Sequence, residues 1–175
     1  EKKNKDIMDS IHYAKRIQEA ILPPKNFVKS HLPESFILYK PKDIVSGDFY
    51  WLEAPLNLPE GGKPVSAQAT GHILFAVVDC TGHGVPGAFV SIVGHLGLKR
   101  ALKEFQLTQP ARILDKLNEI VEETFCQSGT GDIKDGMDIS LCSLNFSSAK
   151  IFLEFSGANN PLWIIRKGNT ILDEI

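Results

Sequence analysis

The sequence has few cysteines, little net charge and no long uninterrupted apolar run. Its 175 residues include three cysteines, Cys80, Cys126 and Cys142, and no two of them form a CxxC pair. This pattern argues against a disulfide framework and against zinc or redox motifs, and it fits a reducing, cytoplasmic setting. The net charge of −2 provides no general attraction to nucleic acid or acidic membranes, so we expect no nucleic-acid partner.

A transmembrane segment is also missing from the sequence. A membrane-spanning helix needs about 20 consecutive apolar residues. The most apolar stretch, 73–98, is interrupted by Asp79, His83, Pro86 and His95. We therefore expect no membrane contact by this segment and a cytoplasmic location, although a longer parent protein could carry a membrane anchor upstream.

The N-terminal segment 6–22 is predicted to form an amphipathic helix that ends at Pro23-Pro24. Apolar residues recur at three- and four-residue spacing and form one stripe: Ile7, Ile11, Ala14, Ile17 and Ile21. Two interpretations of this stripe stay open. The helix packs on its own domain, or it is the end of a longer coiled coil. We expect it to pair with the helix of a second subunit and to transmit an upstream signal.

The rest of the chain reads as strands, then two helices, then strands again, which predicts an α+β fold with helices packed on antiparallel sheets. Helices are expected over 87–106 and 109–126. Strands are expected over 36–39, 49–54, 72–79, 137–146, 150–156, 162–166 and 170–172.

Two carboxylates stand next to predicted strands. Asp79 ends the strand 72–79, and Asp48 precedes the strand 49–54. If the two strands form an antiparallel hairpin, Asp48 lies opposite Asp79 or Cys80, and two like charges so placed favour a cation between them. Oxygen ligands select Mg²⁺, Mn²⁺ or Ca²⁺. The alternative is that Asp79 is a turn or helix-capping residue and Asp48 a solvated strand end.

The loop after Asp79 contains Gly82 and Gly84 and leads into a helix. Its backbone N–H groups could hold a phosphate at the helix N-terminus, or it could be a plain strand–helix turn. It is not a Walker A loop, because no Gly-Lys-Ser/Thr follows, and it lacks the third glycine of a dinucleotide fingerprint.

Five motifs occur in a fixed order along the chain. They are Ser10-Ile11-His12-Tyr13-Ala14-Lys15-Arg16-Ile17-Gln18, Ser46-Gly47-Asp48-Phe49-Tyr50-Trp51, Asp79-Cys80-Thr81-Gly82-His83-Gly84-Val85-Pro86-Gly87-Ala88, Asp135-Gly136-Met137-Asp138 and Ser156-Gly157-Ala158-Asn159-Asn160-Pro161-Leu162. This combination resembles the metal-dependent PPM-type (protein phosphatase 2C-like) serine/threonine phosphatases, in the bacterial sporulation stage II protein E-type subclass.

The resemblance implies a layered β-sandwich flanked by helices, with a site for two Mn²⁺ or Mg²⁺ ions at one end. It assigns Asp79 as the bridging and catalytic aspartate, the carbonyl of Cys80 and the carboxylate of Asp48 as further metal ligands, and Asp138 as the third acidic residue. Asp135 lies close enough in the sequence to be an alternative to Asp138 as the third acidic residue. His83 would supply a proton to the leaving seryl oxygen; the alternative is a locally hydrogen-bonded turn residue.

The same resemblance implies a function and a domain division. The expected activity is hydrolysis of a phosphoserine or phosphothreonine in a bacterial signalling protein, such as an anti-sigma factor antagonist; the alternative is a non-catalytic scaffold with a degenerate site. Residues 1–23 would be a linker and homodimerisation helix, and 24–175 the phosphatase domain. The family's final aspartate would lie beyond residue 175, so we expect a domain incomplete at its C-terminus and poorly active alone.

Overall fold

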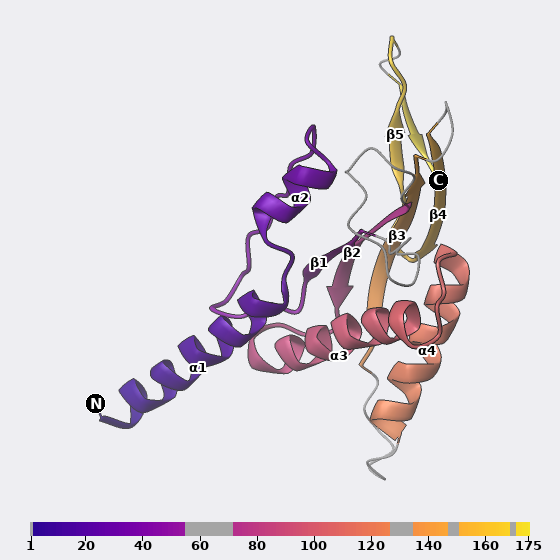
Figure 1. The fold of residues 1–175 in the computed structure, drawn as a ribbon. Helices are drawn as coiled ribbons and strands as arrows, with labels where there is room; N and C mark the ends of the chain where they lie inside the picture. Colours follow the sequence, from indigo (N-terminus) through magenta and orange to yellow (C-terminus); the bar gives the residue numbers. More distant parts are fainter. Residues whose placement is uncertain (1, 55–71, 127–134, 147–150, 169–170) are drawn as a thin grey trace, which may run out of the picture.

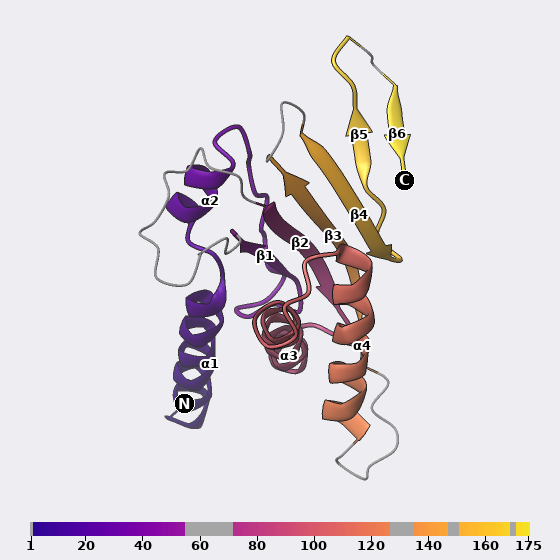
Figure 2. The same cartoon turned by 45° about the vertical axis from the view of Figure 1, so that its right-hand side comes forward.

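A computed structural model of the chain describes residues 2–54, 72–126, 135–146, 151–168 and 171–175. Within these ranges the chain has an α+β fold with an N-terminal helix, as predicted (Figure 1). Four antiparallel strands form one sheet in the order β1-β2-β3-β4, and Figure 2 shows them side by side. Their bounds are Phe49–Glu53, His72–Cys80, Met137–Asn145 and Phe152–Ala158. A second, two-stranded sheet pairs β5, Trp163–Ile165, with β6, Leu172–Glu174.

Two long helices cover one face of the four-stranded sheet: α3, Gly84–Lys103, and α4, Pro110–Cys126. The alternation of side chains along β2 sends Leu74, Ala76, Val78 and Cys80 to this face, and all four are buried. They pack with β1 and β3 against one stripe of each helix. The helix residues in this core are Val90, Leu98, Ala101, Leu102, Ile113 and Leu117.

A short helix, α2, Lys25–His31, packs on the opposite face, where its Val28 meets Leu52 and Ile73 at the far ends of β1 and β2. The expected helices on both sides of the sheet are therefore present in the described part of the chain. The helix α2 was not predicted, because Pro23-Pro24 indicates only where the preceding helix ends. That preceding helix, α1, spans Lys2–Ile21 (Figure 1).

The predicted strand 36–39 is wrong. These residues belong to no sheet, and Phe36 and Leu38 are 90% and 76% exposed. Their continuous apolar run is typical of a strand, but a strand also needs a hydrogen-bonding partner, and none of the described strands pairs with this segment. The last two predicted strands are present, and β6 begins two residues later than expected.

None of the helices in the described ranges has the length and the apolar composition that crossing a bilayer requires.

Candidate metal centre

The connection between β2 and α3 requires glycine at two positions for its backbone conformation. Gly82 and Gly84 have φ angles of +84° and +65°, which residues with a side chain rarely adopt. Gly47 packs against the same loop: a Cβ there would lie 2.6 Å from the Gly82 carbonyl oxygen and 3.1 Å from that of Cys80. The loop that carries Asp48 is thus held in direct contact with the loop that follows Asp79.

Asp48 and Asp79 come together as the predicted hairpin requires. β1 pairs with β2 in antiparallel register, with Phe49 opposite Val78, so the next position places Asp48 opposite Asp79. Both residues are exposed, on the sheet face away from α3 and α4. Partial burial raises the pKa of Asp48, and the negative charge of Asp79 and a hydrogen bond with its carboxyl raise that pKa further. The two carboxylates therefore repel each other when both are ionised.

This pair suits a divalent cation. Among the described residues, no lysine, arginine or histidine forms an ion pair with either carboxylate. The repulsion is therefore not neutralised by a protein cation, and hard oxygen donors favour Mg²⁺ or Mn²⁺.

If Cys80 is a metal ligand, only its backbone carbonyl can serve, because its thiol is buried. The side chain is 3% exposed and belongs to the core under α3. Burial raises the pKa of the Cys80 thiol to about 12, and the charges of Asp48 and Asp79 act in the same direction. A neutral, buried thiol does not bind a metal ion. The carbonyl lies beside Gly47, so the predicted role of Cys80 as a carbonyl ligand is compatible with the fold.

Asp138 lies on the strand next to Asp79. In the register of β2 with β3, Asp79 is directly opposite Asp138, so both point to the same face of the sheet. The Asp138 carboxylate accepts a hydrogen bond of 2.8 Å from Asn159 Nδ2. Asn159, at the end of the β4 segment, is a neighbour of the site that the sequence analysis did not assign.

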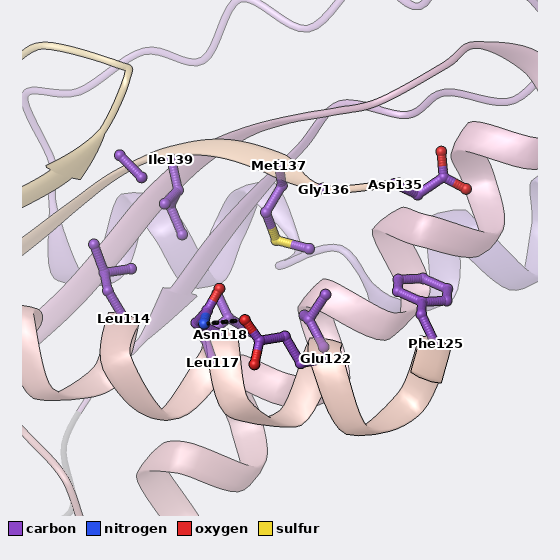
Figure 3. Close-up of a pocket in the computed structure, with 11 residues that line it drawn as sticks. Leu114, Leu117, Asn118, Glu122, Phe125, Asp135, Gly136, Met137 and Ile139 are labelled. Atoms are coloured by element: carbon purple, nitrogen blue, oxygen red, sulfur yellow. Dashed lines mark hydrogen bonds between the residues drawn. The ribbon is translucent and has the colours of Figure 1, made fainter. Parts of the chain in front are cut away.

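Asp135 has a different setting. It precedes β3 at the rim of a cavity of about 370 Å³ between α4 and β3 (Figure 3). In Figure 3, Met137 points toward α4, whereas the Asp135 carboxylate points away from it. Since Met137 faces the helices, the next residue, Asp138, faces the acidic side. The register therefore favours Asp138 over Asp135 as the neighbour of Asp79.

The described residues contain no group of three or more His, Cys, Asp or Glu side chains that could hold one metal ion. Within these ranges the four predicted ligands, Asp48, Asp79, Cys80 and Asp138, do not converge into such a group. The arrangement is a carboxylate pair with a carbonyl beside it, and Asp138 next to it on β3. Their roles as ligands stay predictions.

His83 lies in the loop between β2 and α3, and its Nδ1 is 2.7 Å from Asp43 Oδ2. A carboxylate accepts hydrogen bonds, so Nδ1–H donates and Nε2 is left for other chemistry. The side chains are 69% and 42% exposed. Its hydrogen-bond partner is 40 positions away and therefore not local in the chain, and the role of His83 as a proton donor stays a prediction. Asp43 was missed because a lone loop aspartate gives no sequence signal.

A cavity of about 530 Å³ opens on the acidic face. Asp48 and Asp79 line it together with Lys40 and Asn160. Tyr39 also lines it and donates a hydrogen bond of 3.3 Å to the Asp48 carbonyl oxygen. The wall of this cavity thus carries the carboxylates of Asp48 and Asp79 and the ammonium group of Lys40. The carboxylates can bind a metal cation, and Lys40 can bind an anionic group beside it.

No family model and no curated protein matches this chain. Among solved structures, it is similar to the SiaA-PP2C domain of Pseudomonas aeruginosa, with 31% sequence identity and a TM-score of 0.70. The similarity covers 91% of this chain and 56% of the other, so the chain spans little more than half of that domain's length. This similarity supports the resemblance to PP2C-like domains, but it does not support assignment to the sporulation stage II protein E-type subclass. The chain therefore has the α+β fold of part of a PP2C-like domain.

Proposed function

We propose that this chain is part of a metal-dependent phosphoprotein phosphatase that hydrolyses phosphoserine or phosphothreonine. One observation carries the proposal: Asp48 and Asp79 face each other at the end of β1 and β2, without a protein cation between them in the described ranges, in a fold similar to a PP2C domain. The substrate that the sequence resemblance suggests is a small phosphorylated regulator such as an anti-sigma factor antagonist.

In this proposal Asp48, Asp79 and the Cys80 carbonyl hold Mn²⁺ or Mg²⁺, with Asp138 as a further acid. When bound, two such ions would lower the pKa of a water molecule and neutralise phosphoryl charge. Lys40, in the wall of the same cavity, is placed to attract the phosphate. The water oxygen bonds to phosphorus as the bond from phosphorus to the seryl oxygen breaks.

His83 then completes the reaction. The seryl oxygen is a poor leaving group unless it receives a proton. Asp43 accepts the Nδ1–H of His83, which orients the ring so that Nε2, when protonated, can donate to the seryl oxygen. Asp43 is thus a positioning residue for His83 in this proposal.

The test uses two substrates and a metal readout. Mn²⁺ binding by the 175-residue chain is measured by calorimetry, and phosphate release is followed from a phosphoserine peptide and from para-nitrophenyl phosphate. We expect Mn²⁺ binding, and slow peptide hydrolysis that stops in excess EDTA, because the chain alone is expected to be poorly active. Full turnover in EDTA would contradict the proposal. Hydrolysis of para-nitrophenyl phosphate without the peptide would instead indicate a small-ester hydrolase.

A second candidate is a non-catalytic scaffold with an incomplete site. It is favoured by the absence of a three-residue metal group from the described ranges and by the hydrogen bond that occupies Asp138. Under this alternative the chain binds a phosphoprotein or Mn²⁺ weakly and releases no phosphate.

A further inference from the structure

The tight turn after β4 has an unusual backbone conformation at Asn159. Its φ angle is +60°, a value that few residues other than glycine adopt. The Asn160 N–H donates to the Ala158 carbonyl oxygen at 2.8 Å, which closes a three-residue turn around Asn159. Gly157 supports the turn, since a Cβ there would lie 2.6 Å from the Asn160 carbonyl oxygen. Strained residues of this kind are concentrated at functional sites, and the side chain of Asn159 lies at the candidate metal centre.

The turn places the Asn159 carboxamide on Asp138. The backbone of Asn159 forms an isolated β-bridge with Ile139, the residue directly after Asp138. Asn159 Nδ2 then donates to Asp138 Oδ1 at 2.8 Å. The second oxygen, Oδ2, accepts no hydrogen bond from any residue in the described ranges. The bond thus holds one oxygen of the carboxylate and leaves the other without a partner among these residues.

The partner of Asp138 is uncharged, unlike the partners of two other carboxylates of the chain. Asp173 is paired with Arg166 at 3.2 Å, and Glu53 with Lys103 at 3.3 Å. A cationic partner neutralises a carboxylate and competes with a metal ion for it. A carboxamide restrains the rotation of the carboxylate and leaves its negative charge for a metal ion. The hydrogen bond to Asp138 is therefore compatible with a role of this carboxylate as a metal ligand.

We propose that Asn159 is a positioning residue that holds the Asp138 carboxylate beside Asp79, so that less freedom is lost when a divalent cation binds. Asp138 lies directly opposite Asp79 in the register of β2 with β3. Removal of a partner that orients a metal ligand weakens metal affinity by about 10- to 100-fold. This inference rests on the proposed function for its effect on metal, whereas the contact between Asn159 and Asp138 is independent of it.

The experiment compares Mn²⁺ binding by Asn159→Gly and Asn118→Ala, measured by calorimetry. Glycine adopts a φ of +60° without cost, so the first variant keeps the turn and removes only the carboxamide. Asn118 is a matched control on α4, because its Nδ2 also donates to a carboxylate oxygen, Glu122 Oε1, at 2.8 Å (Figure 3). We expect the dissociation constant to rise about tenfold in Asn159→Gly and to stay unchanged in Asn118→Ala. If Asn159 only shaped the turn, Asn159→Gly would bind Mn²⁺ as the wild type does, and the proposal would be overturned.

A double-mutant cycle shows whether Asn159 acts through Asp138. Asp138→Asn is made alone and together with Asn159→Gly, and the Mn²⁺ dissociation constants are compared with those of the wild type and of Asn159→Gly. We expect Asn159→Gly to weaken binding about tenfold when Asp138 is present and to have no further effect in the Asp138→Asn chain. A tenfold loss that persists in the Asp138→Asn chain would refute the proposal, because the effect would not pass through this carboxylate.

A further readout needs neither a metal ion nor a variant of Asn159. In EDTA, the Nδ2 proton signals of Asn159 in a heteronuclear NMR spectrum report its hydrogen bond to Asp138. We expect them to shift in Asp138→Asn, because a charged acceptor binds a donor more strongly than a neutral one, whereas the Asn118 signals should not move. Unchanged Asn159 signals would overturn the proposal. A wild-type chain that binds no Mn²⁺ while the Asn159 signals shift would instead refute the proposed function, and with it the effect on metal, and leave the contact intact.

Discussion

Gly87 on α3 approaches Gly47 so closely that a Cβ on Gly87 would lie 3.0 Å from the Gly47 Cα. The same Cβ would lie 2.6 Å from the Gly82 carbonyl oxygen, a backbone atom that cannot move aside alone. These contacts join the two loops of the candidate metal centre to the start of α3.

Gly87→Ala should therefore destabilise the chain by about 1–3 kcal/mol, the usual cost of overpacking. Urea unfolding followed by circular dichroism measures the change. Gly136→Ala is the matched control, because a Cβ there would meet nothing within 4 Å. A Gly87→Ala variant as stable as Gly136→Ala would show that the loops are not held together in this way.

Asp79→Asn should abolish phosphate release while the fold remains. The substitution keeps the shape of the side chain and removes the charge on which metal binding depends. Phosphopeptide turnover at saturating Mn²⁺ is the measurement, with Asp115→Asn, an exposed residue of α4, as the control. If Asp79→Asn retained more than a tenth of the wild-type rate, the bridging role of Asp79 would be wrong.

Asp48→Asn should stabilise the metal-free chain, and the gain should depend on pH. The pKa of Asp48 is raised above 3.8 in the folded chain, so ionised Asp48 opposes folding. The stability that its protonated form provides is complete below the unfolded pKa and is lost as pH rises through the folded pKa. Urea unfolding in EDTA measures the free energy of unfolding of both chains. Asp48→Asn and wild type should be equally stable below the unfolded pKa of Asp48, and above its folded pKa the variant should be more stable by a constant amount. An advantage that is independent of pH would contradict this explanation.

Asp43→Asn should slow hydrolysis of a phosphoserine peptide more than hydrolysis of para-nitrophenyl phosphate. The aryl oxygen is a good leaving group and needs no proton from His83, whereas the seryl oxygen does. The control is Asp173→Asn, since Asp173 pairs with Arg166 at 3.2 Å and its side chain has the same 42% exposure as Asp43. Equal losses on both substrates would assign Asp43 a role other than orienting a proton donor.

The proposed homodimer predicts that apolar residues of α1 contact a second subunit. Ile7 and Ile17 are 57% and 46% exposed, whereas Ile11 and Ala14 of the same stripe are half-buried. Light scattering of Ile7→Asp with Ile17→Asp should show a lower mass than wild type, and valine at both positions should preserve it. A mass that aspartate leaves unchanged would favour packing of α1 on its own domain alone.

The elements with strong periodic patterns were predicted from sequence, and so was the hairpin that brings Asp48 to Asp79. The predicted strand 36–39 was wrong because an apolar run does not reveal whether a partner strand is present. Positions 150 and 170, at which two of the predicted strands begin, lie outside the described residues.

The hydrogen-bonded part of the site could not be predicted in the same way. Asp43 and His83, and Asn159 and Asp138, are far apart in sequence and meet only through the tertiary fold. Asn159 was visible as part of a motif, but the motif does not indicate which side chain its carboxamide contacts. Only the fold shows that this partner is an acidic residue of the candidate metal centre.

The buried thiol of Cys80 can be used to measure local opening of the core between β2 and α3. Cys80 follows Asp79 directly, and its sulfur lies under α3, so an alkylating reagent reaches it only when β2 and α3 separate. The rate at which this thiol is modified therefore measures how often that part of the core opens. A ligand that holds Asp79 in place would lengthen the intervals between openings, and the modification rate would record its binding without any turnover.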